Sequence, residues 1–170
     1  MDQPRVLGLD LSVTASGVAR DDGATETIKP KRQGDQRLTE IRKIVGDVTG
    51  GAELVVIEDF VVRSAASSIT GMVHGAVREL LLSRGIPYAV IAPATLKAFA
   101  TGKGNGDKTA MAMAAYKRAE REFADDNQCD AWWLRQAGLH HLGRPEFSLP
   151  ADQVARLDKV AWPALPKAVA

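Results

Sequence analysis

A ten-residue stretch in the first half of the chain, residues 53–62, constrains the fold more than any other feature. Leu54 to Ile57 are all apolar, and the acid pair Glu58 and Asp59 follows them directly. A strand with one face in water alternates apolar and polar residues, whereas this stretch is apolar on both faces. It therefore predicts a central strand that is covered by helices on both sides and ends in acid.

The segments around this strand predict a layered α/β domain. Short β-prone runs at residues 6–11, 13–19 and 24–28, with a turn at Asp21-Asp22-Gly23, predict an antiparallel meander. Apolar residues at helical spacing predict a helix over residues 35–48 that ends at Gly50-Gly51. We further expect a strand at residues 88–91 and helices at 67–84, 93–100, 108–123 and 126–140. Strands first, followed by alternating helices and strands, indicate a mixed sheet.

The chain of 170 residues fits one domain of ordinary size. We expect that domain to span residues 1–144, and we expect the proline-spaced segment 145–170 to be a C-terminal tail that packs on the domain or on a partner. The formal net charge is only +1, so affinity for a polyanion must come from local clusters. A single cysteine, Cys129, and the lack of a signal segment or a long apolar stretch predict a soluble cytoplasmic protein with no membrane contact.

Three acidic places lie where a structural acid is unusual. Asp10 falls within the first strand, Glu58 ends the central strand, and Asp130 lies in an apolar helix that opens with Asp125 and Asp126. A buried carboxylate costs several kcal/mol unless a cation or hydrogen bonds compensate it. Each acid also has a structural interpretation: Asp10 can cap backbone amides, Glu58 can enter solvent at the strand end, and the helix-opening acids can act as N-caps.

Taken together, these acids favour a metal site. In a helix, Asp130 shares a face with Asp126 and with Asn127, so one turn can aim two oxygen ligands at one point. Ligands that are all oxygen suit Mg²⁺, or Mn²⁺ as its substitute, rather than zinc. Two such ions about 4 Å apart can activate a water and stabilise the leaving oxygen in phosphodiester cleavage.

The loop from Gly102 to Thr109 nearly spells a phosphate-binding P-loop, but Asp107 stands where that motif needs glycine. We therefore do not expect this loop to hydrolyse nucleotides, and we expect Asp107 to be the N-cap of a helix that begins at Lys108. Basic residues recur along this edge, and they either form a solvated face or contact phosphates without reading sequence. They are Lys97, Lys103, Lys108, Lys117, Arg118 and Arg121.

Four motifs, in this order, resemble those of the RuvC-like Holliday-junction resolvases, which belong to the RNase H-like nucleases. The resemblance covers roughly residues 5 to 140. The matching residues are Gly8-Leu9-Asp10 with Ser12 and 17–19, then Val56-Ile57-Glu58, then 92–97 with Thr101-Gly102 and Asp107-Lys108, and finally Asp130-Ala131.

The resemblance implies a five-stranded mixed sheet flanked by helices, a homodimer with two active sites, and Mg²⁺-dependent cutting of branched DNA. It implies that Asp10 and Glu58 are metal ligands and that Asp130 is the final carboxylate. Lys108 would lie near the scissile phosphate, and Lys97 would help to bind DNA.

Two departures from the family pattern bear on the site. The family usually carries a second acid three residues before the last one, and this chain has Asn127 there. Either Asn127 ligates through its carbonyl oxygen or Asp126 substitutes for it. The family also tends to place an aromatic wedge after the strand acid, and Phe60 is offset from that position. We expect Trp132 and Trp133 to be packing residues rather than base-stacking platforms, and Met72, Met111 and Met113 to fill the core.

The leading hypothesis is a metal-dependent, structure-selective DNA endonuclease that resolves four-way junctions and other branched DNA. One alternative is a small nucleotide-binding protein of the actin-like or sugar-kinase-like type, in which Gly8 to Ser12 and Thr14 would hold the nucleotide. Such proteins normally need two lobes, for which this chain is short. A second alternative is a junction-binding protein without catalytic activity, if Asn127 has removed one metal.

Overall fold

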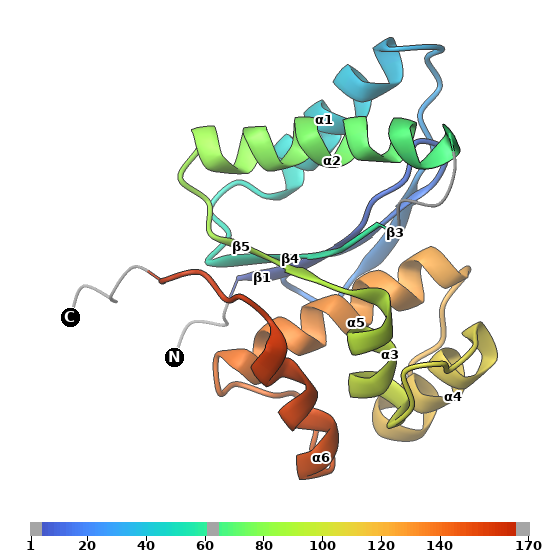
Figure 1. Cartoon of the computed structure of the whole chain (residues 1–170), viewed down its shortest axis with the longest axis vertical. Coiled ribbons are helices and arrows are strands. Elements are labelled where there is room, and N and C mark those ends of the chain that lie inside the picture. The colour runs from blue at the N-terminus through green and yellow to red at the C-terminus, as the bar shows by residue number, and fades with distance from the viewer. Residues whose placement is uncertain (1–4, 61–64, 166–170) are drawn as a thin grey trace.

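The computed structural model describes residues 5–60 and 65–165 of the chain. Its centre is a five-stranded sheet in the order β3-β2-β1-β4-β5 (Figure 1). Strands β1 (Val6–Asp10), β2 (Ser16–Ala19) and β3 (Thr25–Ile28) pair antiparallel, whereas β4 (Leu54–Glu58) and β5 (Tyr88–Ile91) run parallel to β1. The predicted mixed sheet with an opening meander is confirmed.

Two tight connections shape the meander. The β1–β2 loop is held by the Ser16 hydroxyl, which donates to the Ser12 carbonyl oxygen at 2.7 Å and accepts from the Ser12 backbone N–H at 2.9 Å. The β2–β3 turn closes with a 2.8 Å hydrogen bond from the Arg20 N–H to the Ala24 carbonyl oxygen. Gly23 has φ +85°, a conformation in which a side chain would be strained.

Helices cover both faces of the sheet (Figure 1). On one face lie α1 (Gln36–Val48) and α2 (Ala65–Ser83), which pack with Leu7, Leu9 and Ile57. On the other face α5 (Asp126–His141) packs with Val6 and Val56. Successive residues of β1 and β4 therefore point into two different cores, and this explains why the central run is apolar throughout.

Helix α5 lies unusually close to the sheet because β1 and β2 present glycines to it. A Cβ atom at Gly8 would lie 1.9 Å from the carbonyl oxygen of Ala131, and one at Gly17 would lie 2.0 Å from the carbonyl oxygen of Asn127. Neither distance is compatible with a side chain. The two glycines thus set how far the helix that carries Asp126 and Asp130 stands from the strand that carries Asp10.

Two shorter helices, α3 (Pro93–Thr101) and α4 (Lys108–Ala119), lie below α5 in Figure 1. The prediction for Asp107 is confirmed, since its carboxylate accepts from the Ala110 N–H at 2.8 Å as the N-cap of α4. The prediction that this helix reaches residue 123 is wrong. It ends at Ala119 because Glu120 adopts a left-handed conformation with φ 51°.

The segment after α5 folds back onto the domain. It contains α6 (Ala151–Val154) and the 3-10 helix η1 (Ala155–Lys159). Leu157 is buried, and the Trp162 ring stacks on His141 with 4.0 Å between ring centroids. This segment therefore adds apolar surface to the α5 side of the core.

The packing predictions for the large apolar residues are partly confirmed. Trp132 and Trp133 are both buried, and the indole N–H of Trp133 donates to the Met111 carbonyl oxygen at 3.2 Å. Met111 is buried as expected. Met72 and Met113 are each 48% exposed, so their assignment to the core is wrong.

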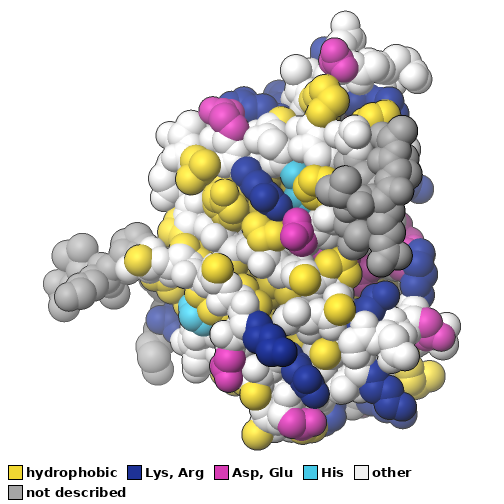
Figure 2. All heavy atoms as spheres, in the orientation of Figure 1, with side chains coloured by type: hydrophobic (Ala, Val, Ile, Leu, Met, Phe, Trp, Pro, Cys, Tyr) yellow, Lys and Arg dark blue, Asp and Glu magenta, His cyan; other side chains and the backbone are white. Residues whose placement is uncertain are grey.

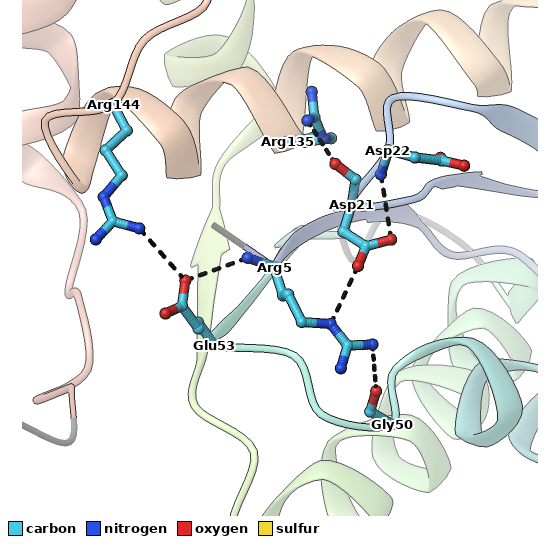
Figure 3. A network of polar contacts seen from close by, with 7 residues as sticks. All are labelled: Arg5, Asp21, Asp22, Gly50, Glu53, Arg135 and Arg144. Atoms are coloured by element: carbon cyan, nitrogen blue, oxygen red, sulfur yellow. Dashed lines mark hydrogen bonds and ion pairs between the residues drawn. The ribbon is translucent and has the colours of Figure 1, made fainter. Parts of the chain in front are cut away.

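At the end of the sheet opposite to the acids, a polar network connects the start of β1 with the β2–β3 turn, the segment before β4 and helix α5 (Figure 3). Arg5, just before β1, donates to Asp21 and to the Gly50 carbonyl oxygen, and its backbone N–H donates to Glu53. Arg135 of α5 donates to the Asp21 carbonyl oxygen.

In the described part of the chain, no helix has both the length and the hydropathy needed to cross a membrane.

Candidate metal and nucleic-acid site

Asp10 and Glu58 come together because they end neighbouring parallel strands. Leu9 of β1 pairs with Ile57 of β4, so the next residue of each strand lies at the same edge of the sheet. Both acids are only partly accessible to solvent. The carboxyl ends of parallel strands are where α/β proteins commonly place ligand sites.

Helix α5 brings two further acids to this edge. Asp126 and Asp130 are one helical turn apart, and α5 packs across β1, β2 and β4. The approach at Gly8 and Gly17 places the first two turns of the helix against the end of β1. The structure therefore gathers the four predicted acids Asp10, Glu58, Asp126 and Asp130 from three elements.

The buried acids perturb one another. Burial, reinforced by the charges of Asp130 and Asp126, raises the pKa of Asp10 to about 7. Burial, together with Asp10 and Asp130, raises the pKa of Glu58 to about 8. Burial and Asp126 raise the pKa of Asp130 to about 6. Like charges held together in a low-dielectric site are the condition that a bound divalent cation relieves.

Two lysines stand beside these acids. The ammonium group of Lys108, the first residue of α4, donates a hydrogen bond to the Asp126 carboxylate and lowers the pKa of that acid. The charge of Lys97, on α3, opposes the rise in the pKa of Glu58 and of Asp130. Both predicted lysines thus lie close enough to the acid cluster to act on its charges.

The acids at the start of α5 have different roles. Asp125 is the N-cap, since its carboxylate accepts from the Gln128 N–H at 3.0 Å and from the Thr27 hydroxyl at 2.6 Å. Asp126 faces the site and acts on Asp10 more strongly than Asp125 does. Asn127 is half-buried, and its backbone carbonyl packs against Gly17 of β2. The N-cap interpretation therefore holds for Asp125.

The other predicted DNA-binding residues form a separate group. Lys103, Lys117 and Arg118 line a surface hollow together with Thr101 and with Gln153 of the C-terminal segment. Figure 2 shows Lys and Arg side chains recurring over the lower half of this face, where Figure 1 places α3, α4 and α6. The basic edge expected from sequence is thus divided between the acid site and the side of the domain that carries the C-terminal segment.

The donor chemistry of the acid cluster fits a hard divalent cation. Its ligand candidates are carboxylate oxygens and the Asn127 amide oxygen, which suit Mg²⁺ or Mn²⁺. Within residues 5–60 and 65–165, no three acidic, histidine or cysteine side chains already form a close metal-binding cluster. The buried, mutually repelling carboxyl groups nevertheless provide the charge and the low-dielectric setting that such an ion needs.

A cluster on α2 was missed by the sequence reasoning. His74 is buried and hydrogen-bonds to the backbone of Leu11, next to Asp10. Arg78 forms an ion pair of 3.3 Å with Asp59, next to Glu58. The Phe60 ring packs on His74 with 4.7 Å between centroids, so Phe60 lies against α2 in this structure and does not project as a wedge. The four-residue spacing of His74 and Arg78 was the available signal.

The chain matches no protein-family model and no curated protein. Among solved structures, RuvC from Thermus thermophilus is similar, with 20% identity, a TM-score of 0.67, and coverage of 82% of this chain and 96% of that chain. T. thermophilus RuvC in complex with a Holliday junction substrate is similar with 21% identity, a TM-score of 0.68 and the same coverage. At this identity the likeness shows the fold: the chain has a RuvC-like, RNase H-like fold.

Proposed function

We propose that this protein is a divalent-metal-dependent endonuclease that cuts four-way and other branched DNA by phosphodiester hydrolysis. The observation that carries the proposal is the convergence of Asp10, Glu58 and Asp130 at one edge of the sheet, with mutual effects on their pKa values. The RuvC-like fold adds support, because one of the similar structures is bound to a Holliday junction substrate.

In this proposal, Asp10, Glu58 and Asp130 hold Mg²⁺, or Mn²⁺ in its place, with Asp126 or Asn127 as a further ligand. A pair of such ions supplies an activated water and neutralises the charge on the leaving oxygen. The protein's own part is to orient the DNA strand. Lys108 and Lys97 place positive charge beside the acids, where a phosphate can be held.

Resolution of a four-way junction takes two cuts, and a dimer with two active sites can make both. We propose a homodimer that works in the cytoplasm, where the buried thiol of Cys129 stays reduced. The exposed apolar residues Ile69, Met72 and Leu82 of α2 give that helix a surface that a second copy can cover. Sedimentation at several protein concentrations tests this assembly.

The decisive experiment is a cleavage assay on four-way, three-way, flap and linear duplex DNA, with and without Mg²⁺. We expect metal-dependent cutting of the branched substrates, and we expect Asp10→Asn to lower the rate about 100-fold or more because it removes charge at the reacting centre. Asp47→Asn, the same change at an exposed acid of α1, should cut at the wild-type rate.

Two outcomes would replace the proposal by one of its alternatives. Tight binding of junctions without cutting in either Mg²⁺ or Mn²⁺ would indicate a junction-binding protein without catalytic activity. Heat released on titration with ATP, together with a lack of cutting, would indicate a nucleotide-binding protein.

A further inference from the structure

A hollow between α4 and the start of α5 opens directly beside the acid site. Its apolar lining consists of Ala112, Met113, Tyr116, Phe123 and Cys129, and we call it the α4–α5 hollow. Lys108 and Asp126 line the same hollow and are also part of the acid site. A DNA strand whose phosphate is held at the acids would therefore lie close to the hollow.

Two large side chains that border the hollow, Met113 and Tyr116, are only half-buried. Met111 and Ala115 bury one face of α4, whereas Met113 is 48% and Tyr116 is 51% exposed on the face that borders the hollow. Phe123 completes the aromatic lining and contacts Trp132 of the core, with 5.7 Å between ring centroids. Large apolar side chains grouped in a surface hollow indicate a binding site.

The charged groups around the hollow mostly have partners within the protein. Asp126 accepts from Lys108, and Asp125 accepts from Thr27 and from the backbone. Arg121 donates to the Gly23 carbonyl oxygen at 3.0 Å, and its guanidinium lies 5.8 Å from the centre of the Phe123 ring. The rim of the hollow is therefore charged and held in place by contacts within the protein, while its interior is apolar.

This combination fits a nucleobase better than it fits a protein partner. Tyr, Phe, Met and a guanidinium plane are the side chains on which an unstacked base stacks, and rim cations attract the phosphates on either side of it. The position of the hollow also favours DNA over a protein partner, because Lys108 and Asp126 belong both to the hollow and to the proposed DNA-cutting site.

We propose that the α4–α5 hollow binds one unstacked nucleobase of the DNA strand whose phosphate lies at the acids, with Tyr116 as the main stacking surface. The inference rests on the proposed function, because the acids must receive a DNA phosphate for the base to reach the hollow. The exposed face of α4 then holds one base out of the stack next to the cut.

The test is a double-mutant cycle between Tyr116 and the base. Dissociation constants are measured in EDTA, to prevent cutting, for an intact four-way junction and for junctions that each lack one base near the crossover. Tyr116→Ala should weaken binding of the intact junction about tenfold, the equivalent of roughly 1.4 kcal/mol. Removal of the base that enters the hollow should weaken wild-type binding by a similar factor, and Tyr116→Ala should then add little.

Two variants serve as controls. Tyr116→Phe keeps the ring and should bind like the wild type. Thr39→Ala shortens an exposed side chain of α1, on the other face of the sheet and outside the proposed dimer surface, and should change nothing in these binding measurements. The proposal is overturned if Tyr116→Ala binds as tightly as the wild type, or if its loss is the same for every junction. It is also overturned if Tyr116→Ala changes the oligomeric state in sedimentation, since a second copy would then cover the hollow.

Cleavage in Mg²⁺ separates this inference from the proposed function. If the wild type cuts DNA but Tyr116 shows no coupling to any base, the proposed base site is rejected and the proposed nuclease activity stands. Coupling without any cutting would keep the base site and remove the nuclease.

Discussion

Burial and the negative charges of neighbouring acids raise the pKa values of the same three carboxyl groups in this protein. Asp10, Glu58 and Asp130 have pKa values of about 7, 8 and 6, well above those of ordinary acids. A carboxyl group whose pKa is higher in the folded state binds more protons there than in the unfolded chain. The free energy of unfolding therefore falls as pH rises through this range.

This linkage gives a prediction for the metal-free protein. Between about pH 5 and about pH 8 the free energy of unfolding should decrease, and Asp10→Asn should show a smaller decrease because one of the three groups no longer ionises. Mg²⁺ added at the higher pH should restore stability. Urea unfolding in EDTA and in Mg²⁺ measures both effects. A wild-type curve that is flat with pH, or one that Asp47→Asn flattens as much as Asp10→Asn, would contradict the prediction.

Lys108 offers a second prediction at a single residue. Its ammonium group hydrogen-bonds to Asp126, so it competes with a cation for that carboxylate and also stands ready to contact a phosphate. Lys108→Gln should therefore bind Mg²⁺ about two- to fivefold more tightly, a modest change because the pair is exposed. The same variant should cut about 100-fold more slowly at saturating Mg²⁺, because it loses positive charge beside the reacting phosphate.

Cleavage rates measured over a range of Mg²⁺ concentrations separate these two effects. Lys103→Gln is the matched control, since Lys103 lies in the hollow that Lys117 and Arg118 also line. This variant should leave the apparent Mg²⁺ affinity unchanged. Weaker Mg²⁺ binding by Lys108→Gln would show that the lysine does not compete for Asp126.

At the scale of the elements, the position of α5 on the sheet decides the geometry of the site. The helix approaches so closely that Gly8 and Gly17 have no room for a Cβ atom. Glycine weakens a strand by its conformational freedom. Here the two glycines bring the backbone of α5 against β1 and β2, and with it Asp126 and Asp130 toward Asp10.

Gly8→Ala should therefore damage both stability and activity. The added methyl group clashes with the backbone of Ala131, and overpacking of this kind costs about 3 kcal/mol or more. Displacement of α5 also moves Asp130 away from Asp10, so the remaining folded protein should cut more slowly. Gly50→Ala is the control because nothing lies within 4 Å of the Cβ position. Urea midpoints and cleavage rates of the two variants provide the comparison, and equal midpoints would refute the clash.

At the scale of the whole molecule, a net charge of +1 means that DNA affinity depends on where the cations lie. Lys117 and Arg118 line a hollow that the C-terminal segment helps to form, away from the acids. We expect these residues to contact phosphates of a DNA arm and to leave the chemistry untouched.

Lys117→Gln should weaken junction binding in EDTA, and it should reduce the slope of log affinity against log salt by about 1. Its cleavage rate at saturating DNA should equal that of the wild type. Lys43→Gln on α1, on the opposite face of the sheet, should keep the full slope. An unchanged slope for Lys117→Gln would remove this hollow from the DNA-binding surface.

The sequence by itself determined the order of elements, the central strand and the candidate acids, because these depend on local pattern: apolar runs, turn residues and acids at strand and helix ends. Asp107 as an N-cap belongs to the same local class. The left-handed residue Glu120, the exposed faces of Met72 and Met113, and the cluster of Phe60, His74 and Arg78 were decided only by the tertiary structure. The exposure of the two methionines and the α2 cluster depend on which distant segment packs against a helix, and periodicity along one segment does not identify that segment. For the same reason the sequence named both Asp126 and Asn127, whereas the docking of α5 on Gly8 and Gly17 turned Asp126 toward Lys108 and the Asn127 backbone toward the sheet.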